Sequence, residues 1–210
     1  KPMVGDMKDV QQLLDWAAQG KKVTGGSSLR FVAEVQEYLA EPADERGEVH
    51  TAFAGCGTDE YNYGIHGYAL LSGLMGAGIR SVRYLGASAQ KHLQVEWKDG
   101  RIGYLCIGEG AWLPFHITAV TDKNVRQITC DNGKLYRSLL EAELPYLAGE
   151  QEEAPLEMSE LLEPELCALA ARLRGGAQVF LSDLELGDSG YDGAIFAEGY
   201  RRQRYPKSSD

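Results

Sequence analysis

The chain has 210 residues, of which 31 are acidic and 21 are basic, so its formal net charge is −10. Hydrophobic residues make up 44% and charged residues 25%, which is ordinary for a chain with a packed core and excludes disorder along the whole length. The negative charge argues against a nucleic-acid partner. No apolar run reaches the roughly 18 residues that a bilayer-spanning helix needs, so we expect no membrane partner.

The first quarter of the chain predicts a helix followed by short segments. Val10 and Leu13 fall at helical spacing within residues 5–19, Asp6 is placed to cap that helix, and Gly20 is placed to end it. The segments that follow are predicted as a strand over 21–24, a Gly-Ser turn, a helix over 31–40, a solvated turn over 41–47 and a strand over 48–54.

The middle of the chain predicts mainly strands. A polar loop over 55–63 leads into an apolar helix over 66–75, and the pattern is then that of strands up to residue 130. Residues 98–101 (Lys-Asp-Gly-Arg) are typical of a hairpin turn. The expected strands cover residues 81–85, 93–97, 102–107, 115–121 and 125–129. Whether Tyr84, Trp97 and Tyr104 point to the open or the covered face of such a sheet is left open by the sequence.

The last third predicts helices again. They are expected over 135–147, 161–174 and 191–204, with an acidic loop over 149–155, a brief strand over 179–181 and a disordered tail over 205–210. A block of strands followed by helices predicts an α+β fold with a large, open, mostly antiparallel sheet covered on one face by helices. The other face is then exposed to solvent or covered by a partner.

The four cysteines are expected to be buried free thiols. Cys56, Cys106, Cys130 and Cys167 form no C-x-x-C pair and are widely spaced. Free thiols are typical of a reducing compartment, and the first residues show no apolar segment of the kind found in secretory leaders. We therefore expect a cytoplasmic protein.

His66 is the histidine whose surroundings best suit chemistry. It stands where a polar loop meets an apolar helix, and a helix start lowers the pKa of a histidine. A neutral imidazole can accept a proton near pH 7. Asn62 lies four residues earlier and is placed to orient the ring through an amide hydrogen bond. The other three histidines lie in strand patterns and are expected to be structural.

Other motifs give weaker candidates. Residues 73–78 are glycine-rich but follow a helix, the reverse of a dinucleotide-binding fingerprint, and are expected to be a turn. Residues 24–28 lack the full fingerprint spacing and are also expected to be a turn. A metal-dependent hydrolase that uses His50, His66, Asp59 and Glu60 is a further, weaker hypothesis.

Three segments in order resemble the glucose–fructose oxidoreductase and inositol dehydrogenase family. Lys1-Pro2 precedes a helix, a strand and an Arg-Phe pair at residues 30–31, as the Glu-Lys-Pro signature does in that family. Residues 62–66 (Asn-x-Gly-x-His) resemble its Asp-x-Gly-x-His segment, which leads into a helix ending in glycine. The strands around residues 97–101 resemble its substrate domain, a large open antiparallel sheet.

The resemblance implies an NAD- or NADP-dependent oxidoreductase that acts on a sugar, cyclitol or related polyol. It implies catalytic roles for Lys1, beside the nicotinamide and the substrate hydroxyl, and for His66 as acid/base, with Lys1 and Pro2 at the cofactor. Asn62 replaces the family's usual aspartate, so the base is expected to be weaker unless Asp59 or Glu60 supplies the missing charge. Alternatively the dehydrogenase chemistry is altered or lost.

The resemblance also implies the domain division and the remaining site residues. Residues 1–28 are expected to be the last piece of a Rossmann domain whose glycine-rich fingerprint lies upstream, and residues 29–204 the substrate-binding and oligomerisation domain. Arg30, Asp59 and Tyr63 are assigned to the substrate, although Arg30 is also compatible with a structural role. A homo-oligomer through the open sheet face is expected. The alternative is a non-enzymatic ligand-sensing or oligomerisation module of the same fold.

Overall fold

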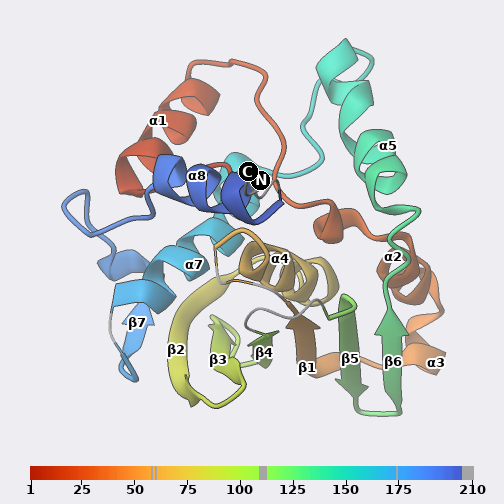
Figure 1. The fold of residues 1–210 in the computed structure, drawn as a ribbon. Coiled ribbons are helices and arrows are strands. Elements are labelled where there is room, and N and C mark those ends of the chain that lie inside the picture. The colour runs from red at the N-terminus through yellow and green to blue at the C-terminus, as the bar shows by residue number, and fades with distance from the viewer. Residues whose placement is uncertain (58, 60, 109–112, 174, 205–210) are drawn as a thin grey trace, which may run out of the picture.

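A seven-stranded sheet forms one layer of the computed structural model, which describes residues 1–204 except 58, 60, 109–112 and 174 (Figure 1). The strand order is β6-β5-β1-β4-β3-β2-β7. Neighbouring strands run antiparallel except β1 and β4, which run parallel. The strands are β1 (Val49–Cys56), β2 (Ile79–Ala87), β3 (Gln90–Trp97), β4 (Ile102–Gly108), β5 (His116–Thr121), β6 (Val125–Thr129) and β7 (Gln178–Phe180).

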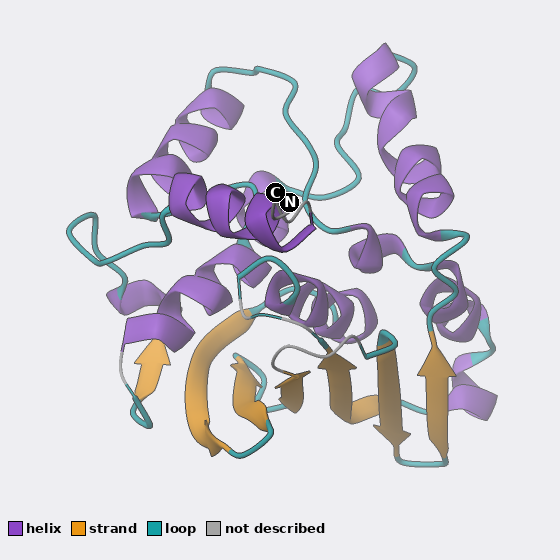
Figure 2. Ribbon diagram, in the orientation of Figure 1, coloured by secondary structure: helices purple, strands orange, loops and turns teal. Residues whose placement is uncertain are grey.

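The helices lie on one side of this sheet (Figure 2). They are α1 (Met7–Ala18), α2 (Ala33–Ala40), α3 (Ala43–Arg46), α4 (Gly64–Met75), α5 (Leu135–Ala148), α6 (Met158–Leu161), α7 (Glu163–Leu173) and α8 (Gly193–Arg204). Helix α4 packs on β1 and β4, and α7 packs on β2. This arrangement confirms the predicted α+β class with a mostly antiparallel sheet covered on one face.

β1 is the strand that the local pattern places least well. It was expected as a separate strand before a run of five, and the structure inserts it between β5 and β4. Its residues Ala52 and Ala54 are buried under the helices, and the small side chains let α4 lie close to the strand. The end of β1 therefore points toward the loop that leads into α4, which is where the candidate site forms.

The predicted strand over residues 21–24 is wrong. These residues pair with no strand in the described part of the chain. They are held instead by α5: Lys22 Nζ donates to the carbonyl oxygen of Tyr146 at 3.0 Å, and the Thr24 hydroxyl lies 3.3 Å from a carboxylate oxygen of Glu143. A strand needs a neighbouring strand to pair with, and among the described residues none lies beside 21–24.

Two helix boundaries also differ from the prediction. The helix expected over 161–174 corresponds to α7, which begins two residues later, and the one-turn helix α6, separated from it by Leu162, was not predicted. Pro164 explains the division, because proline lacks the N–H that would continue the hydrogen bonding from α6 but is well tolerated in the first turn of a new helix. The turn expected over 41–47 contains the one-turn helix α3. The tail over 205–210 lies outside the described residues.

The face of the sheet away from the helices carries a pair of aromatic side chains. Phe53 on β1 is 47% exposed and stacks on Tyr104 of β4 with ring centroids 5.1 Å apart. Trp97 points the other way: it is buried in the core, and its Nε1 donates to the carbonyl oxygen of Gly76 at 3.0 Å. Tyr84 is partly buried against the core. Of the three aromatic residues left open by the sequence, Tyr104 is the one that packs with an exposed side chain on the open face.

Three of the four cysteines are buried free thiols as predicted. Cys106 differs, because it is half-buried on β4, with its sulfur 3.3 Å from Nδ1 of His92. None of the four forms a disulfide. Within the described residues, no helix is long and apolar enough to cross a membrane.

Candidate active site

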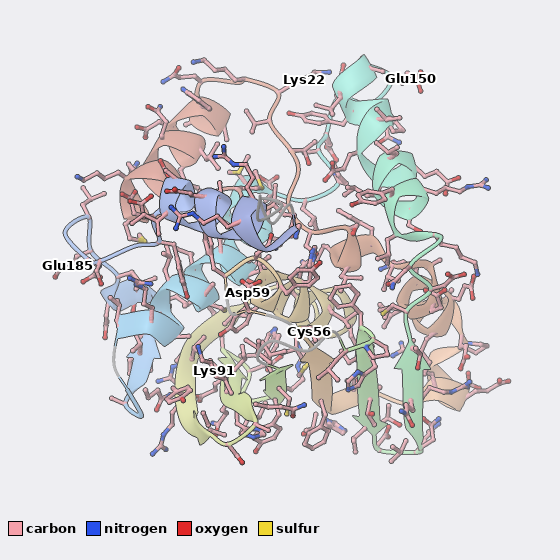
Figure 3. The ribbon with its side chains drawn as sticks, in the orientation of Figure 1. Lys22, Cys56, Asp59, Lys91, Glu150 and Glu185 are labelled. Carbon is pink, nitrogen blue, oxygen red and sulfur yellow. The ribbon has the colours of Figure 1, made fainter. Side chains whose placement is uncertain are left out.

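The loop between β1 and α4 brings the first residues of the chain to the start of α4. Asp59 shapes this loop: its carboxylate accepts from the N–H of Asn62 at 2.6 Å, and its carbonyl oxygen accepts from the N–H of Gly64 at 2.9 Å. These two bonds close a turn, after which α4 begins. Cys56, at the end of β1, and Asp59 lie in this region beside α4 (Figure 3).

Lys1 reaches the loop and binds Asn62. Its Nζ donates to the side-chain oxygen of Asn62 at 2.9 Å and to the carbonyl oxygen of the same residue at 3.0 Å. The ammonium also lies 4.9 Å from the centroid of the Tyr63 ring. Burial lowers the pKa of Lys1, and the charge of Asp59 opposes that shift. The lysine is therefore a partly desolvated cation with an amide, a ring and a carboxylate around it.

His66 lies in the first turn of α4 and is almost fully buried, with 8% of its surface exposed. Its Nδ1 is 2.6 Å from the hydroxyl oxygen of Ser27, and its ring packs edge-on against Tyr63 and Phe115 at centroid distances of 6.0 Å and 5.2 Å. Burial, and to a smaller extent the charge of Lys1, lowers the pKa of His66 to about 3. The ring is therefore neutral at pH 7.

The structure corrects the expected partner of the imidazole. Lys1 binds the side-chain oxygen of Asn62, and the Ser27 hydroxyl is the hydrogen-bond partner of Nδ1 of His66. The predicted direction of the His66 pKa shift agrees with the structure, but its causes are burial and the lysine charge instead of the helix start. Asn62 thus positions the cation, and Ser27 positions the ring.

The other predicted site residues fall into two groups. Asp59 and Tyr63 lie with Lys1, Asn62 and His66, and Pro2 follows Lys1 directly. Arg30 lies behind them: it is 7% exposed, burial lowers its pKa, and the charges of Glu163 and Glu160 oppose that shift. A contact between Arg30 and a substrate stays a prediction. Glu60 lies outside the described residues.

Sequence reasoning missed two residues of this site, Ser27 and Phe115. Ser27 was placed in a Gly-Ser turn; the structure instead shows irregular backbone over 21–27 that leads into the short 3₁₀ helix Ser28–Phe31. The Ser27 hydroxyl caps this helix by accepting from the N–H of Leu29 at 3.2 Å. A serine before a helical turn predicts that cap. Nothing in the local pattern predicts that the same hydroxyl meets a histidine 39 residues later.

The alternative motifs gain no support from the geometry. Residues 73–78 end α4 and turn into β2, and Gly76 caps the helix at φ 79°, a conformation that glycine adopts readily. His50 is exposed on β1. Among the residues that the structure describes, no three His, Cys, Asp or Glu side chains gather as a metal site would require.

The buried neutral His66 makes stability depend on pH. Its pKa is lowered in the folded state, so its contribution is complete above the unfolded value of about 6.5 and is lost as the pH falls toward 3. We expect the free energy of unfolding to fall by at most about 5 kcal/mol over that range, measured by urea denaturation. His66→Asn should flatten this dependence, whereas His50→Asn, at an exposed position, should leave it unchanged. An equal slope in all three proteins would contradict the assignment.

Comparison with known proteins supports the fold. No protein-family model matches the chain, and no curated protein matches its sequence. Solved structures do match. The scyllo-inositol dehydrogenase of Lactobacillus casei, solved with bound NAD(H) and scyllo-inositol, has a TM-score of 0.70 at 13% identity over 87% of this chain and 72% of that one.

Two further structures are similar. The myo-inositol dehydrogenase of Lactobacillus casei, in complex with NAD(H) and myo-inositol, has a TM-score of 0.67 at 12% identity, over 86% of this chain and 68% of that chain. An oxidoreductase from Thermotoga maritima has a TM-score of 0.62 at 16% identity, over 88% and 70%. At these identities the likeness establishes a shared fold, and it confirms the fold that the sequence resemblance implies.

Proposed function

We propose that this chain supplies the substrate-binding and proton-transfer side of an NAD- or NADP-dependent oxidoreductase acting on a sugar, cyclitol or related polyol. The observation that carries the proposal is the pairing of Lys1 with His66. A desolvated ammonium and a buried neutral imidazole lie together at the start of α4, on a fold shared with inositol dehydrogenases. Alcohol oxidation can use both groups, because the imidazole accepts the hydroxyl proton and the ammonium stabilises the negative charge that develops on the oxygen.

Each side chain has a distinct task in this proposal. His66 accepts the hydroxyl proton at Nε2, because Nδ1 is occupied by Ser27. Lys1 uses two of its three N–H groups on Asn62, and the third is directed to the substrate oxygen, where it stabilises developing negative charge. Tyr63 and Phe115 form an aromatic wall that excludes water from the imidazole.

The residues present fit the nicotinamide end of the cofactor. When bound, the nicotinamide accepts the hydride of the alcohol carbon. Lys1 and Pro2 would stand beside it, and they are held in place from behind because the N–H of Met3 donates to Glu165 at 3.0 Å. In this proposal the rest of the cofactor would bind to a Rossmann domain of which residues 1–28 are the last piece.

The test is turnover by the full-length protein on a panel of inositols, sugars and acyclic polyols, with NAD and with NADP. Production of the reduced cofactor, followed by absorbance, on at least one cyclitol or sugar supports the proposal. Specific binding of a polyol without turnover under any cofactor would instead support the alternative, a ligand-sensing module. The observation that favours this alternative is Asn62 in place of the family's usual aspartate, since an amide cannot stabilise an imidazolium by charge. No binding and no turnover would overturn both.

We also propose that the open sheet face forms a homo-oligomer. Phe53 and Tyr104 present a stacked aromatic pair there, and a stable interface buries roughly 1,200 Å² or more in total. Light scattering should find an oligomer that Phe53→Asp converts to a monomer, because the interface would bury an unpaired charge. Leu186→Asp, at a position 55% exposed outside the sheet, should leave the assembly unchanged. A wild-type protein that stays monomeric at high concentration would contradict this proposal.

A further inference from the structure

The hydroxyl proton of Ser27 needs an acceptor that the site residues described so far do not supply. The Ser27 oxygen accepts from the N–H of Leu29 at 3.2 Å and lies 2.6 Å from Nδ1 of His66. If His66 is to accept a proton at Nε2, its own proton must sit on Nδ1 and be donated to Ser27. Both acceptor positions of the serine oxygen are then used, and its hydroxyl proton must point to a third partner.

A small cavity lies where that third partner would be. It encloses about 10 Å³, which is room for about one water molecule, and Ser27, Arg30 and Glu165 are its polar lining residues. Within the described residues, Nη1 of Arg30 is buried without a hydrogen-bond partner. A buried guanidinium N–H of this kind is normally satisfied, and a water in the cavity would satisfy it.

Glu165 is the acidic group of this cavity. It lies in α7 with 3% of its surface exposed, and one carboxylate oxygen accepts from the N–H of Met3 at 3.0 Å. Burial raises the pKa of Glu165 to about 7, and the bond from Met3 opposes that shift. A carboxyl group with this pKa exchanges a proton readily at neutral pH, whereas the neutral imidazole of His66 does not keep a second proton there.

We propose that a water molecule in this cavity joins the Ser27 hydroxyl to Glu165, and that the proton taken up by His66 passes through Ser27 and this water to the Glu165 carboxylate. The water accepts from Ser27 and from Nη1 of Arg30 and donates to Glu165. Glu165 is thus a positioning residue that supplies, from behind the ring, the negative charge that Asn62 lacks. The water link between Ser27 and Glu165 does not depend on the proposed function, whereas the direction of proton transfer rests on it.

The transfer is balanced. As the substrate O–H bond breaks, a bond forms to Nε2 of His66, and the proton on Nδ1 moves to the Ser27 oxygen. The hydroxyl proton of Ser27 moves to the water, and a proton of the water moves to Glu165. A bound nicotinamide would supply the hydride acceptor, so that the alcohol would be oxidised to a carbonyl. The imidazole ends neutral with its proton on Nε2, so no imidazolium accumulates beside Lys1.

The first test measures, without substrate, which ring nitrogen of His66 carries the proton. Nitrogen-15 NMR of the ring, assigned by its loss in His66→Asn, should place the proton on Nδ1 in the wild type at pH 8. Glu165→Gln, which can donate to the water and reverse its orientation, should move at least half of the population to Nε2. Glu143→Gln is the matched control, because Glu143 is another buried glutamate, on α5, that binds Thr24 and does not line the cavity. A proton on Nε2 in the wild type overturns the proposal, and so does a Glu165→Gln spectrum equal to the wild type.

The second test reads turnover against pH. The groups facing His66 and Glu165 are the side chain and α-amino group of Lys1, Arg30 and the phenol of Tyr61. We expect Glu165→Gln to lower kcat at least tenfold with little change in KM and to remove the limb of the pH profile near 7, and Glu165→Asp to restore part of both. An unchanged profile overturns the relay. If Glu165→Gln shifts the tautomer but the protein oxidises no polyol, the water link is supported and the proposed function fails. The two failures are therefore distinguishable.

Discussion

His66→Asn is expected to lower kcat of the full-length protein by about 10²- to 10⁴-fold, the usual contribution of a positioned acid/base group. Asparagine retains a polar group near Ser27 but cannot take up the substrate proton. Because the His66 ring is buried and its Nδ1 bonds to Ser27, His66→Asn should act on turnover more than on substrate affinity. The measurement is steady-state kinetics on the best polyol substrate, with NAD or NADP.

His50→Asn is the matched control for that prediction. His50 is a histidine of β1 that is exposed to solvent, so its replacement should change kcat less than twofold. If His66→Asn turned over at the wild-type rate, the acid/base assignment and the role of Ser27 would both have to be abandoned. If His66→Asn loses activity and also has a lower free energy of unfolding, the pH dependence of unfolding serves as a second measurement of the role of His66.

Trp97→Ala is expected to lower the free energy of unfolding by about 3–5 kcal/mol, the range for truncating a large buried aromatic side chain. Trp97 is 1% exposed, and a Cβ built on Gly103 would lie 3.1 Å from its ring, so the ring fills the space above β4. Its Nε1 also donates to Gly76 at the end of α4. The truncation removes both the packing and the bond that joins the helix to the sheet. Urea denaturation followed by circular dichroism measures the change.

Two further variants separate these contributions. Trp97→Phe keeps much of the ring but loses the bond to Gly76, and its cost should be smaller than that of Trp97→Ala, with about 1 kcal/mol from the hydrogen bond. Trp16→Ala is the matched control, because Trp16 is 37% exposed on α1 and should cost less than about 1 kcal/mol. Equal costs for Trp16 and Trp97 would contradict the packing described here.

The two buried titratable groups beside Ser27 have opposite effects on stability, which matters when the pH dependence of unfolding is analysed. His66 has a lowered pKa, so its contribution is lost as the pH falls below about 6.5. Glu165 has a raised pKa, so its contribution is complete below about 4.3 and is lost as the pH rises through about 7. Between those values the two effects partly cancel in the wild type. Single variants at each position separate them.

Local patterning predicted most of the regular elements and part of the candidate site. The apolar spacing and the Asp6 cap predicted α1, and the hairpin signal over 98–101 predicted the β3–β4 turn. These elements depend on neighbouring residues, so the period of side chains along the chain encodes them. The grouping of Lys1 with Asn62 and His66 was implied by the family resemblance, and the structure brings these three residues together.

The errors share a different cause. Residues 21–24 have the composition of a strand but are held by α5, through the carbonyl oxygen of Tyr146 and the carboxylate of Glu143. β1 is inserted between strands that are more than 40 residues away in the chain. Trp97 and Tyr104 look alike in an alternating pattern, yet they face opposite sides of the sheet. A period of two says that faces alternate, but which face is covered depends on where the helices pack.

The sequence by itself determined most of the helices and strands and the α+β class, and its resemblance to a known family pointed to Lys1, Asn62 and His66 at the start of α4. The tertiary structure alone decided the order of the sheet, the partner of His66 and the cavity that joins Ser27, Arg30 and Glu165. The physical reason is range: torsion preferences and hydrophobic periods act over a few residues, whereas burial and hydrogen-bond satisfaction are settled by segments that meet from distant parts of the chain.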